Sequence, residues 1–137
     1  MERPTDHRGS EVLSREECDR LLDSAQVGRV AFLYAGDPHI LPINYRFHQG
    51  AIIFRTTVGS KMDAAEMHRR FAFEIDGWDA DSGSGWSVLA HGMGEAVTDP
   101  EETAALEGLG LVSWAGDESE DMWFRIALDD ITGRGVG

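Results

Sequence analysis

The stretch that decides the fold is Ile52-Ile53-Phe54-Arg55-Thr56-Thr57-Val58-Gly59-Ser60-Lys61. Its apolar, β-branched first half predicts a strand, and the residues from Met62 to Arg69 predict a short helix after it. A strand that ends in hydroxyls, a glycine and a cation at the start of a helix suits a phosphate. Lys61 is the only lysine in the chain, and together with Arg55 it is expected to neutralise a phosphomonoester.

Length and composition predict one globular domain with an ordinary core. The chain has 137 residues, of which 42% are hydrophobic and 27% charged. We expect a flexible N-terminal segment over residues 1–12 and a single domain over residues 13–137. Twenty-five acidic residues against twelve basic ones give a net charge of −13, which repels nucleic acid and anionic membranes. Neither nucleic acid nor a membrane is therefore an expected partner.

The cysteine, histidine and hydropathy patterns argue against disulfides, membrane spans and metal sites. The single cysteine, Cys18, excludes an intramolecular disulfide, and no leader-like segment precedes it, so we expect a cytoplasmic protein. Apolar runs are only a few residues long, which predicts no membrane span. No metal site is predicted, because metal-ligand spacing is absent from the histidines considered with Cys18, namely His39, His48, His68 and His91.

Local patterns place the remaining elements. Ser14 and Glu17 have the spacing of a capping box, and Pro100 follows Thr98 or Asp99, either of which suits a helix N-cap. Turn chemistry at Gly36-Asp37-Pro38 and at His48-Gln49-Gly50 predicts a three-stranded meander. The predicted helices cover 15–25, 62–69 and 100 to about 108–110, and the predicted strands cover 27–34, 40–47, 51–57, 71–76, 86–97, 122–128 and 131–136.

This order of elements predicts a mainly β fold with peripheral helices. The strands lack the long intervening helices that parallel crossovers need, so an antiparallel barrel is favoured over a parallel sheet. Gly92 and Gly94 are expected bulges that bend the long strand over 86–97. The segments Trp78–Gly85 and Trp114–Asp121 are expected loops.

The motifs just described, in their order along the chain, resemble the pyridoxamine 5′-phosphate oxidase-like family, the flavin-binding split barrels. The similarity extends from about Leu13 to Gly133 and is greatest to the branch of nitroimidazole-resistance proteins. Each motif alone is weak, and their order carries the resemblance. The segments concerned are Leu13–Cys18, Val27–Ala31, Leu41–Tyr45, Phe54–Lys61, and Gly85–Val88 followed by Gly92.

The resemblance implies an antiparallel six- to seven-stranded split β-barrel that forms a homodimer and binds FMN in two clefts between subunits. It implies that the flavin phosphate is bound by Arg55, Thr56, Ser60 and Lys61. It further implies that the flavin ring lies beside the backbone of Pro42, Ile43, Asn44 and Tyr45, and that Trp86 and Ser87 lie near the ring or the ribityl chain. Trp123 and Arg125 are candidates to reach across the dimer.

Several interpretations stay open at this point. The branch often carries a histidine where this chain has Arg55, a departure that changes phosphate geometry or favours the deazaflavin F420. Pro42 also fits a simple edge strand, and Trp86 and Trp123 also fit a core or a dimer interface. No catalytic residue is identified, because a flavin needs little from side chains beyond binding and orientation.

Two functions follow from these patterns. The first is an FMN-dependent oxidoreductase that acts on a small organic acceptor. The second is a split-barrel module that binds no cofactor, or binds F420, and has no flavin redox activity; haem is a more distant ligand. The acceptor itself is not predicted, because loops shape such pockets.

Overall fold

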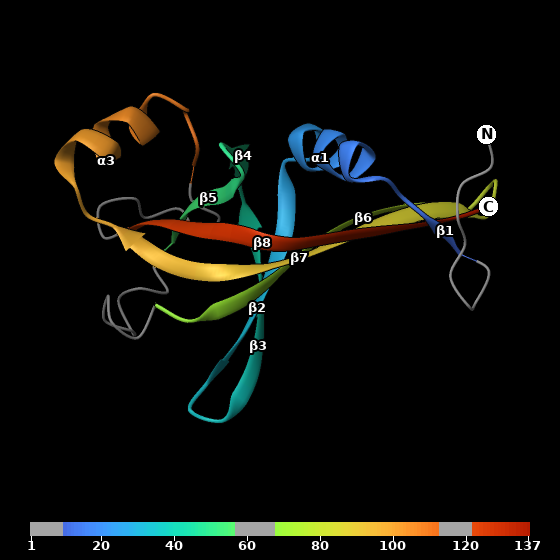
Figure 1. The fold of residues 1–137 in the computed structure, drawn as a ribbon, viewed down its shortest axis with the longest axis horizontal. Helices are drawn as coiled ribbons and strands as arrows, with labels where there is room; N and C mark the ends of the chain where they lie inside the picture. Colours follow the sequence, from blue (N-terminus) through green and yellow to red (C-terminus); the bar gives the residue numbers. More distant parts are fainter. Residues whose placement is uncertain (1–9, 57–67, 113–121) are drawn as a thin grey trace.

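The computed structural model describes residues 10–56, 68–112 and 122–137, and these ranges contain eight strands and two helices (Figure 1). Neither helix in these ranges is long and apolar enough to cross a membrane. The elements are β1 (Glu11–Val12), α1 (Arg15–Ser24), β2 (Val27–Tyr34), β3 (Asp37–Asn44), β4 (Arg46–His48), β5 (Ala51–Thr56), β6 (Arg70–Asp79), β7 (Ser84–Val97), α3 (Pro100–Glu107) and β8 (Met122–Val136).

The strands form one antiparallel sheet in the order β3-β2-β6-β7-β8-β5-β4, and β1 pairs with β8. β3 and β4 stand at the two ends of this order, yet Tyr45 alone separates them in the sequence. The sheet must therefore curl until its two edges approach, and β3 also contacts β5. The mainly β, antiparallel fold class is confirmed, and the described residues alone contain eight strands, where six to seven were expected.

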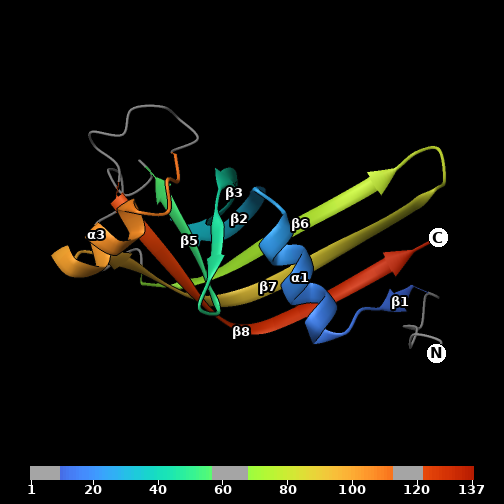
Figure 2. The same ribbon diagram turned by 90° about the horizontal axis from the view of Figure 1, so that it is seen from above.

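Alternating residues of the strands face one core. The largest completely buried side chains include Phe73 of β6, Phe124 and Ile126 of β8, and Ile52 of β5. The α1 helix lies across the sheet and contributes buried Leu22 (Figure 2). The Phe124 ring of β8 meets Phe54 of β5 and Phe71 of β6 edge to face, so the three strands share this aromatic cluster.

The N-caps of α1 and α3 lie where the sequence predicted them. In α1 the Glu17 amide donates to Ser14 Oγ at 3.1 Å, and the Ser14 amide donates to Glu17 Oε1 at 3.2 Å, so the capping box is confirmed. In α3 the side chain of Asp99 accepts from the Glu102 amide at 3.0 Å. The other expected helix falls on residues 62–69, of which 62–67 lie outside the described residues, and the expected loop over 114–121 also lies outside them.

The first turn differs from the expectation. Ala35 and Gly36 link β2 to β3 with φ angles of 52° and 84°, a two-residue hairpin turn with both central residues left-handed. Asp37 and Pro38 were expected in the turn but belong to β3. A proline is tolerated there because β3 is an edge strand of the sheet.

The closing region is one strand, so the prediction of two strands over 122–128 and 131–136 is wrong. Gly92 pairs with Leu128 and His91 pairs with Asp130, which leaves Asp129 as the extra residue of a bulge. A Cβ on Gly92 would lie 2.1 Å from the Ala127 carbonyl oxygen, so the bulge needs glycine. No register shift is found at Gly94, where the expected bulge is also wrong.

Half of the expected loop over Trp78–Gly85 extends the β6–β7 hairpin, and residues 80–83 form its turn. Trp78 pairs with Gly85, and Gly77 pairs with Trp86. A Cβ on Gly77 would lie 2.6 Å from the Trp86 ring, and one on Gly85 would lie 2.6 Å from the Trp78 ring. Each indole therefore covers a glycine of the opposite strand, and this packing extends the paired region.

The N-terminal strand modifies one further expectation. Glu11 and Val12, which the sequence placed in a flexible segment, pair with Gly135 and Arg134 of β8. Residues 1–9 of that segment lie outside the described part of the chain.

Candidate functional site

Arg55 lies near the end of β5, packed between β8 and α3. Its Cζ is 5.0 Å from the centre of the Trp123 ring, and its Nη1 is 3.9 Å from Glu107 Oε2. The Trp123 indole donates to the other oxygen of Glu107, Oε1, at 3.0 Å. The Arg55 side chain is 13% exposed. This arrangement holds a guanidinium near the surface at the strand end where the phosphate site was predicted.

The Arg55 guanidinium could bind a phosphate, and the Glu107 carboxylate competes with the phosphate for it. A guanidinium has five N–H donors, so Arg55 can serve a carboxylate and a phosphate oxygen together. Glu107 is exposed by 53% and reaches Arg55 only at the long limit of an ion pair. A phosphate at Arg55 would therefore have to tolerate, or displace, this carboxylate.

The remaining predicted phosphate ligands are only partly described. Thr56 is the last residue of β5 and directly follows Arg55. Ser60 and Lys61 lie outside the described residues, so their part of the site stays a prediction.

The segment predicted to flank the flavin ring occupies the end of the β3 edge strand. Pro42 is exposed and Ile43 is buried in the core. Asn44 Nδ2 donates to the Val112 carbonyl at 3.4 Å, which ties this edge to the segment after α3. Among the described strands, β3 pairs with β2 alone, so its other edge is the one that could offer backbone groups to a ligand.

Tyr45 has a structural role in the protomer. It is 2% exposed, and its hydroxyl donates to the Leu22 carbonyl of α1 at 2.6 Å. Its ring packs edge to face on Phe73 at 4.7 Å. Burial raises the pKa of the Tyr45 phenol above its usual value of 10.0. This side chain closes the connection between β3 and β4, and the Tyr45 amide donates to the Gln26 carbonyl at 3.1 Å, so only the Tyr45 carbonyl could serve a ligand.

Trp86 and Ser87 are not brought near Arg55 in the protomer. Arg55 pairs with Trp123, which in turn pairs with Val97, whereas Trp86 pairs with Gly135 at the far end of the sheet. Eleven positions of β7 separate Trp86 from Val97, a span of about 35 Å in an extended strand. Figure 2 shows these two ends as opposite extremes of the long β6–β7–β8 ribbon. A single chain does not assemble the whole predicted site.

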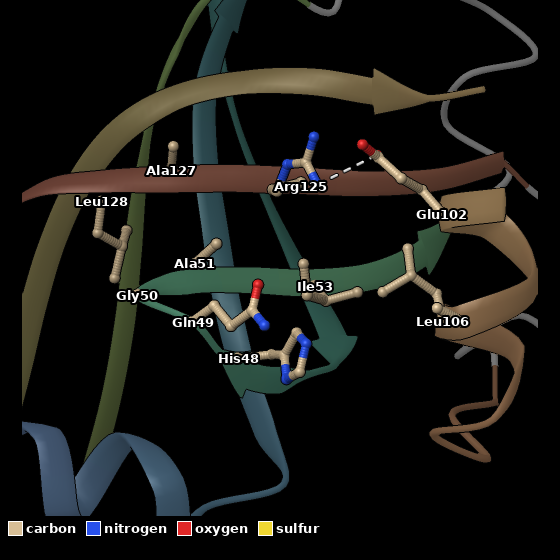
Figure 3. A pocket seen from close by; sticks show the side chains of 11 residues that line it. His48, Gln49, Gly50, Ala51, Ile53, Glu102, Leu106, Arg125, Ala127 and Leu128 are labelled. Atoms are coloured by element: carbon tan, nitrogen blue, oxygen red, sulfur yellow. Dashed lines mark hydrogen bonds and ion pairs between the residues drawn. The ribbon is translucent and has the colours of Figure 1, made fainter. Parts of the chain in front are cut away.

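A pocket of about 610 Å³ lies between the β4–β5 turn, β8 and α3, and Ile53 in its lining is two residues before Arg55 on β5 (Figure 3). We call it the α3 pocket. Its lining residues are His48, Gln49, Gly50, Ala51, Ile53, Glu102, Ala105, Leu106, Arg125, Ala127 and Leu128. Among these residues, sequence reasoning had singled out only Arg125 as a functional candidate. The others were read as turn, strand or helix positions, and only the approach of α3 to β5 and β8 gathers them.

Arg125 is the central charge of the α3 pocket. Its Nε and Nη2 contact Glu95 Oε1 at 2.8 and 2.5 Å, and its Nη1 contacts Glu102 Oε2 at 3.4 Å. Glu95 is the main reason that the pKa of Arg125 is raised. The guanidinium therefore stays charged and is held mainly by Glu95.

One face of the sheet carries an exposed apolar surface. Strand alternation and register place five of the eight large hydrophobic side chains that are exposed in the described part on this face: Val27, Leu33, Ile40, Leu89 and Met93. Arg29 lies among them and contacts Glu74 at 3.1 Å and Asp76 at 3.0 Å. Burial of Glu74 and its proximity to Asp76 raise its pKa. An apolar face with a paired polar group is typical of a protein interface.

Comparisons with known proteins agree with this fold. The family model described as pyridoxamine 5′-phosphate oxidase matches residues 14–135. The uncharacterized protein Rv0080 of Mycobacterium tuberculosis is 36% identical over 102 residues, which cover 71% of this chain and 67% of that protein. The FAD binding protein from Mycobacterium smegmatis is 32% identical, with a TM-score of 0.75 and coverage of 92% of this chain and 99% of that one.

A solved structure also represents the branch named from the sequence. It is a candidate 5-nitroimidazole antibiotic resistance protein from Bacteroides thetaiotaomicron, with a TM-score of 0.72 and coverage of 92% of this chain and 87% of that one. At 15% identity this likeness concerns the fold alone. Together with the match over residues 14–135, these findings establish that the chain belongs to the pyridoxamine 5′-phosphate oxidase family.

Proposed function

We propose that this protein binds a flavin, FMN in particular, and passes hydride or electron pairs from it to a small organic acceptor. The observation that carries the proposal is the near-buried Arg55 guanidinium at the end of β5, in a fold shared with an FAD binding protein 32% identical to this chain. A bound flavin supplies the two-electron chemistry, and the protein supplies binding and orientation. The chain's own part is to anchor the phosphate and to present the β3 edge to the ring.

A phosphate contact at Arg55 would support binding of a cofactor but does not distinguish between FMN, FAD and F420. FMN, FAD and F420 all carry phosphate, which Arg55 and Lys61 would neutralise. Similarity to an FAD binding protein favours a flavin. F420 is the alternative, because Arg55 stands where the resembling branch often has histidine.

We further propose that two chains build each site. Trp86 and Ser87 lie at the far end of the β7 strand from the Arg55 region, so a second copy is needed to bring them to it. The apolar face of Val27, Leu33, Ile40, Leu89 and Met93 offers a surface that a second copy would cover. A monomeric mass at micromolar concentration would contradict this model.

The phosphate anchor is tested by changing Arg55→Ala and Lys61→Ala together. Loss of both cations would leave the phosphate charge without a partner, so the purified double variant should retain no FMN. The matched control is Arg15→Ala with Arg20→Ala, which removes two exposed cations of α1 and the same net charge. Unchanged flavin content in the Arg55 and Lys61 variant would defeat the assignment.

A second candidate function is a binding module without a cofactor. It is motivated by Glu107, which already approaches Arg55 and so offers the guanidinium a partner within the protein. Such a module would be colourless after native purification and would titrate with neither FMN nor F420.

A cytoplasmic location is also proposed, on the basis of one free, buried cysteine, Cys18. Fractionation of cells that produce the full-length protein would test it.

A further inference from the structure

The α3 pocket has the size and the apolar surface of a small-molecule site. Its volume of about 610 Å³ falls within the usual range for ligand pockets, roughly 300–1,000 Å³. Ile53 and Leu106 are buried and form its inner wall with Leu128, which is partly buried. Figure 3 shows these side chains around the hollow, with Arg125 and Glu102 facing each other at its rim.

Around the α3 pocket two carboxylates, Glu102 in its lining and Glu95 just outside it, share the single guanidinium of Arg125. Arg125 is shared by two carboxylates, and Glu95 holds it by the two shorter contacts, at 2.8 and 2.5 Å. Glu102 reaches the same guanidinium only at 3.4 Å, and it is the carboxylate that lines the pocket. One guanidinium cannot neutralise both carboxylates, so the unbalanced charge falls on Glu102. The net charge of −13 for the whole chain adds to the attraction for cations.

We propose that the α3 pocket binds small organic cations that carry an apolar body. The ammonium group of the ligand pairs with Glu102, which gives up its long contact to Arg125, and the apolar body packs on Ile53, Leu106 and Leu128. Arg125 stays paired with Glu95 and does not offer a site to anions. Anionic ligands of the same shape are therefore rejected.

The position of the pocket connects it to the proposed flavin site. Ile53 lies two residues before Arg55 on the same face of β5, and Leu106 precedes Glu107 on α3. Organic cations would thus be the class of acceptor that lies beside the cofactor. This role rests on the proposed function, whereas binding of the cation does not.

The test uses three probes that share a 2-phenylethyl body and differ in charge: 2-phenylethylammonium, 2-phenylethanol and 3-phenylpropanoate. Titration of the full-length protein by calorimetry or NMR should give the tightest binding for the cation, by about fivefold over the alcohol, as expected for a partly exposed ion pair. The anion, 3-phenylpropanoate, should bind most weakly. Glu102→Gln should lower the affinity of the cation to that of the alcohol.

The control is Glu101→Gln, which removes the same charge from the same turn of α3 without touching the pocket. It should keep the cation preference. Equal affinity for all three probes, or a preference that survives Glu102→Gln, would overturn the proposal. Flavin content is measured in the same samples. If the protein contains no flavin but prefers the cation, the pocket proposal is supported and the proposed function is not. If the protein binds flavin but shows no cation preference, the proposed function is supported and the pocket proposal is overturned.

Discussion

Glu107 is predicted to weaken flavin binding, and Glu107→Gln should strengthen it. The Glu107 carboxylate lies 3.9 Å from Arg55 Nη1 and would face any phosphate bound there. Glutamine keeps an oxygen that can accept from the Trp123 indole, which now donates to Glu107 Oε1 at 3.0 Å. The substitution therefore removes a repulsive charge while preserving the packing of α3 on β8.

The size of the effect follows from the distance and the exposure. Two unit charges at 3.9 Å interact by about 1 kcal/mol in water and by about 4 kcal/mol at an effective dielectric constant of 20. A phosphate on Arg55 would lie at a comparable distance from Glu107. Because Glu107 is 53% exposed, the lower value applies, and about 1 kcal/mol corresponds to about fivefold in affinity.

The assay is a fluorescence titration of flavin-free protein with FMN at low salt. Glu107→Gln should lower the dissociation constant about fivefold, and added salt should shrink the difference because it screens the repulsion. Glu101→Gln, which makes the same change in net charge on the same helix, should leave the constant near that of the wild type. Equal or weaker FMN binding by a well-folded Glu107→Gln variant would refute the placement of the phosphate at Arg55.

Three further outcomes are expected. Tyr45→Phe removes the buried hydrogen bond to Leu22, so urea denaturation should show a free energy of unfolding lower by about 1–2 kcal/mol. Because the pKa of Tyr45 is raised in the folded protein, wild-type stability should also fall as pH rises above 10.0. The variant lacks the phenol and should not show that part of the decline. Gly94→Ala places a methyl group 2.5 Å from a phenylalanine ring and should cost about 1–3 kcal/mol, whereas Gly135→Ala, with no atom nearer than 3.5 Å, should cost less. Ile40→Glu puts a charge on the apolar face and should weaken self-association at least about tenfold in ultracentrifugation with an unchanged circular dichroism spectrum; unaltered association would exclude this face as the interface.

Sequence patterns predicted the helices and strands that short-range interactions determine. The capping box of Ser14 and Glu17 marked the start of α1, and apolar alternation marked β6. The single β8 strand was missed because Asp129 and Asp130 look like a turn in the sequence. Their partners are distant: Arg70 contacts Asp129 at 2.7 Å, and His91 contacts Asp130 at 3.2 Å. Pairing across the sheet keeps these acidic residues in a strand.

Of the candidate site, the sequence predicted only the position of Arg55 at the end of a strand. The apolar run before Arg55 located the cation at the end of β5, where the structure has it. The approach of Glu107 and the formation of the α3 pocket depend on how α3 packs against β5 and β8, which no short motif encodes. The contributions of Ser60 and Lys61 stay predictions.

The most direct test of flavin binding is the absorption spectrum of the natively purified protein, with mass analysis of what it releases on denaturation. If the protein binds FMN, it will be yellow and will release FMN in proportion to its phosphate sites. A colourless protein that titrates with neither FMN, FAD nor F420 would contradict the proposed flavin binding.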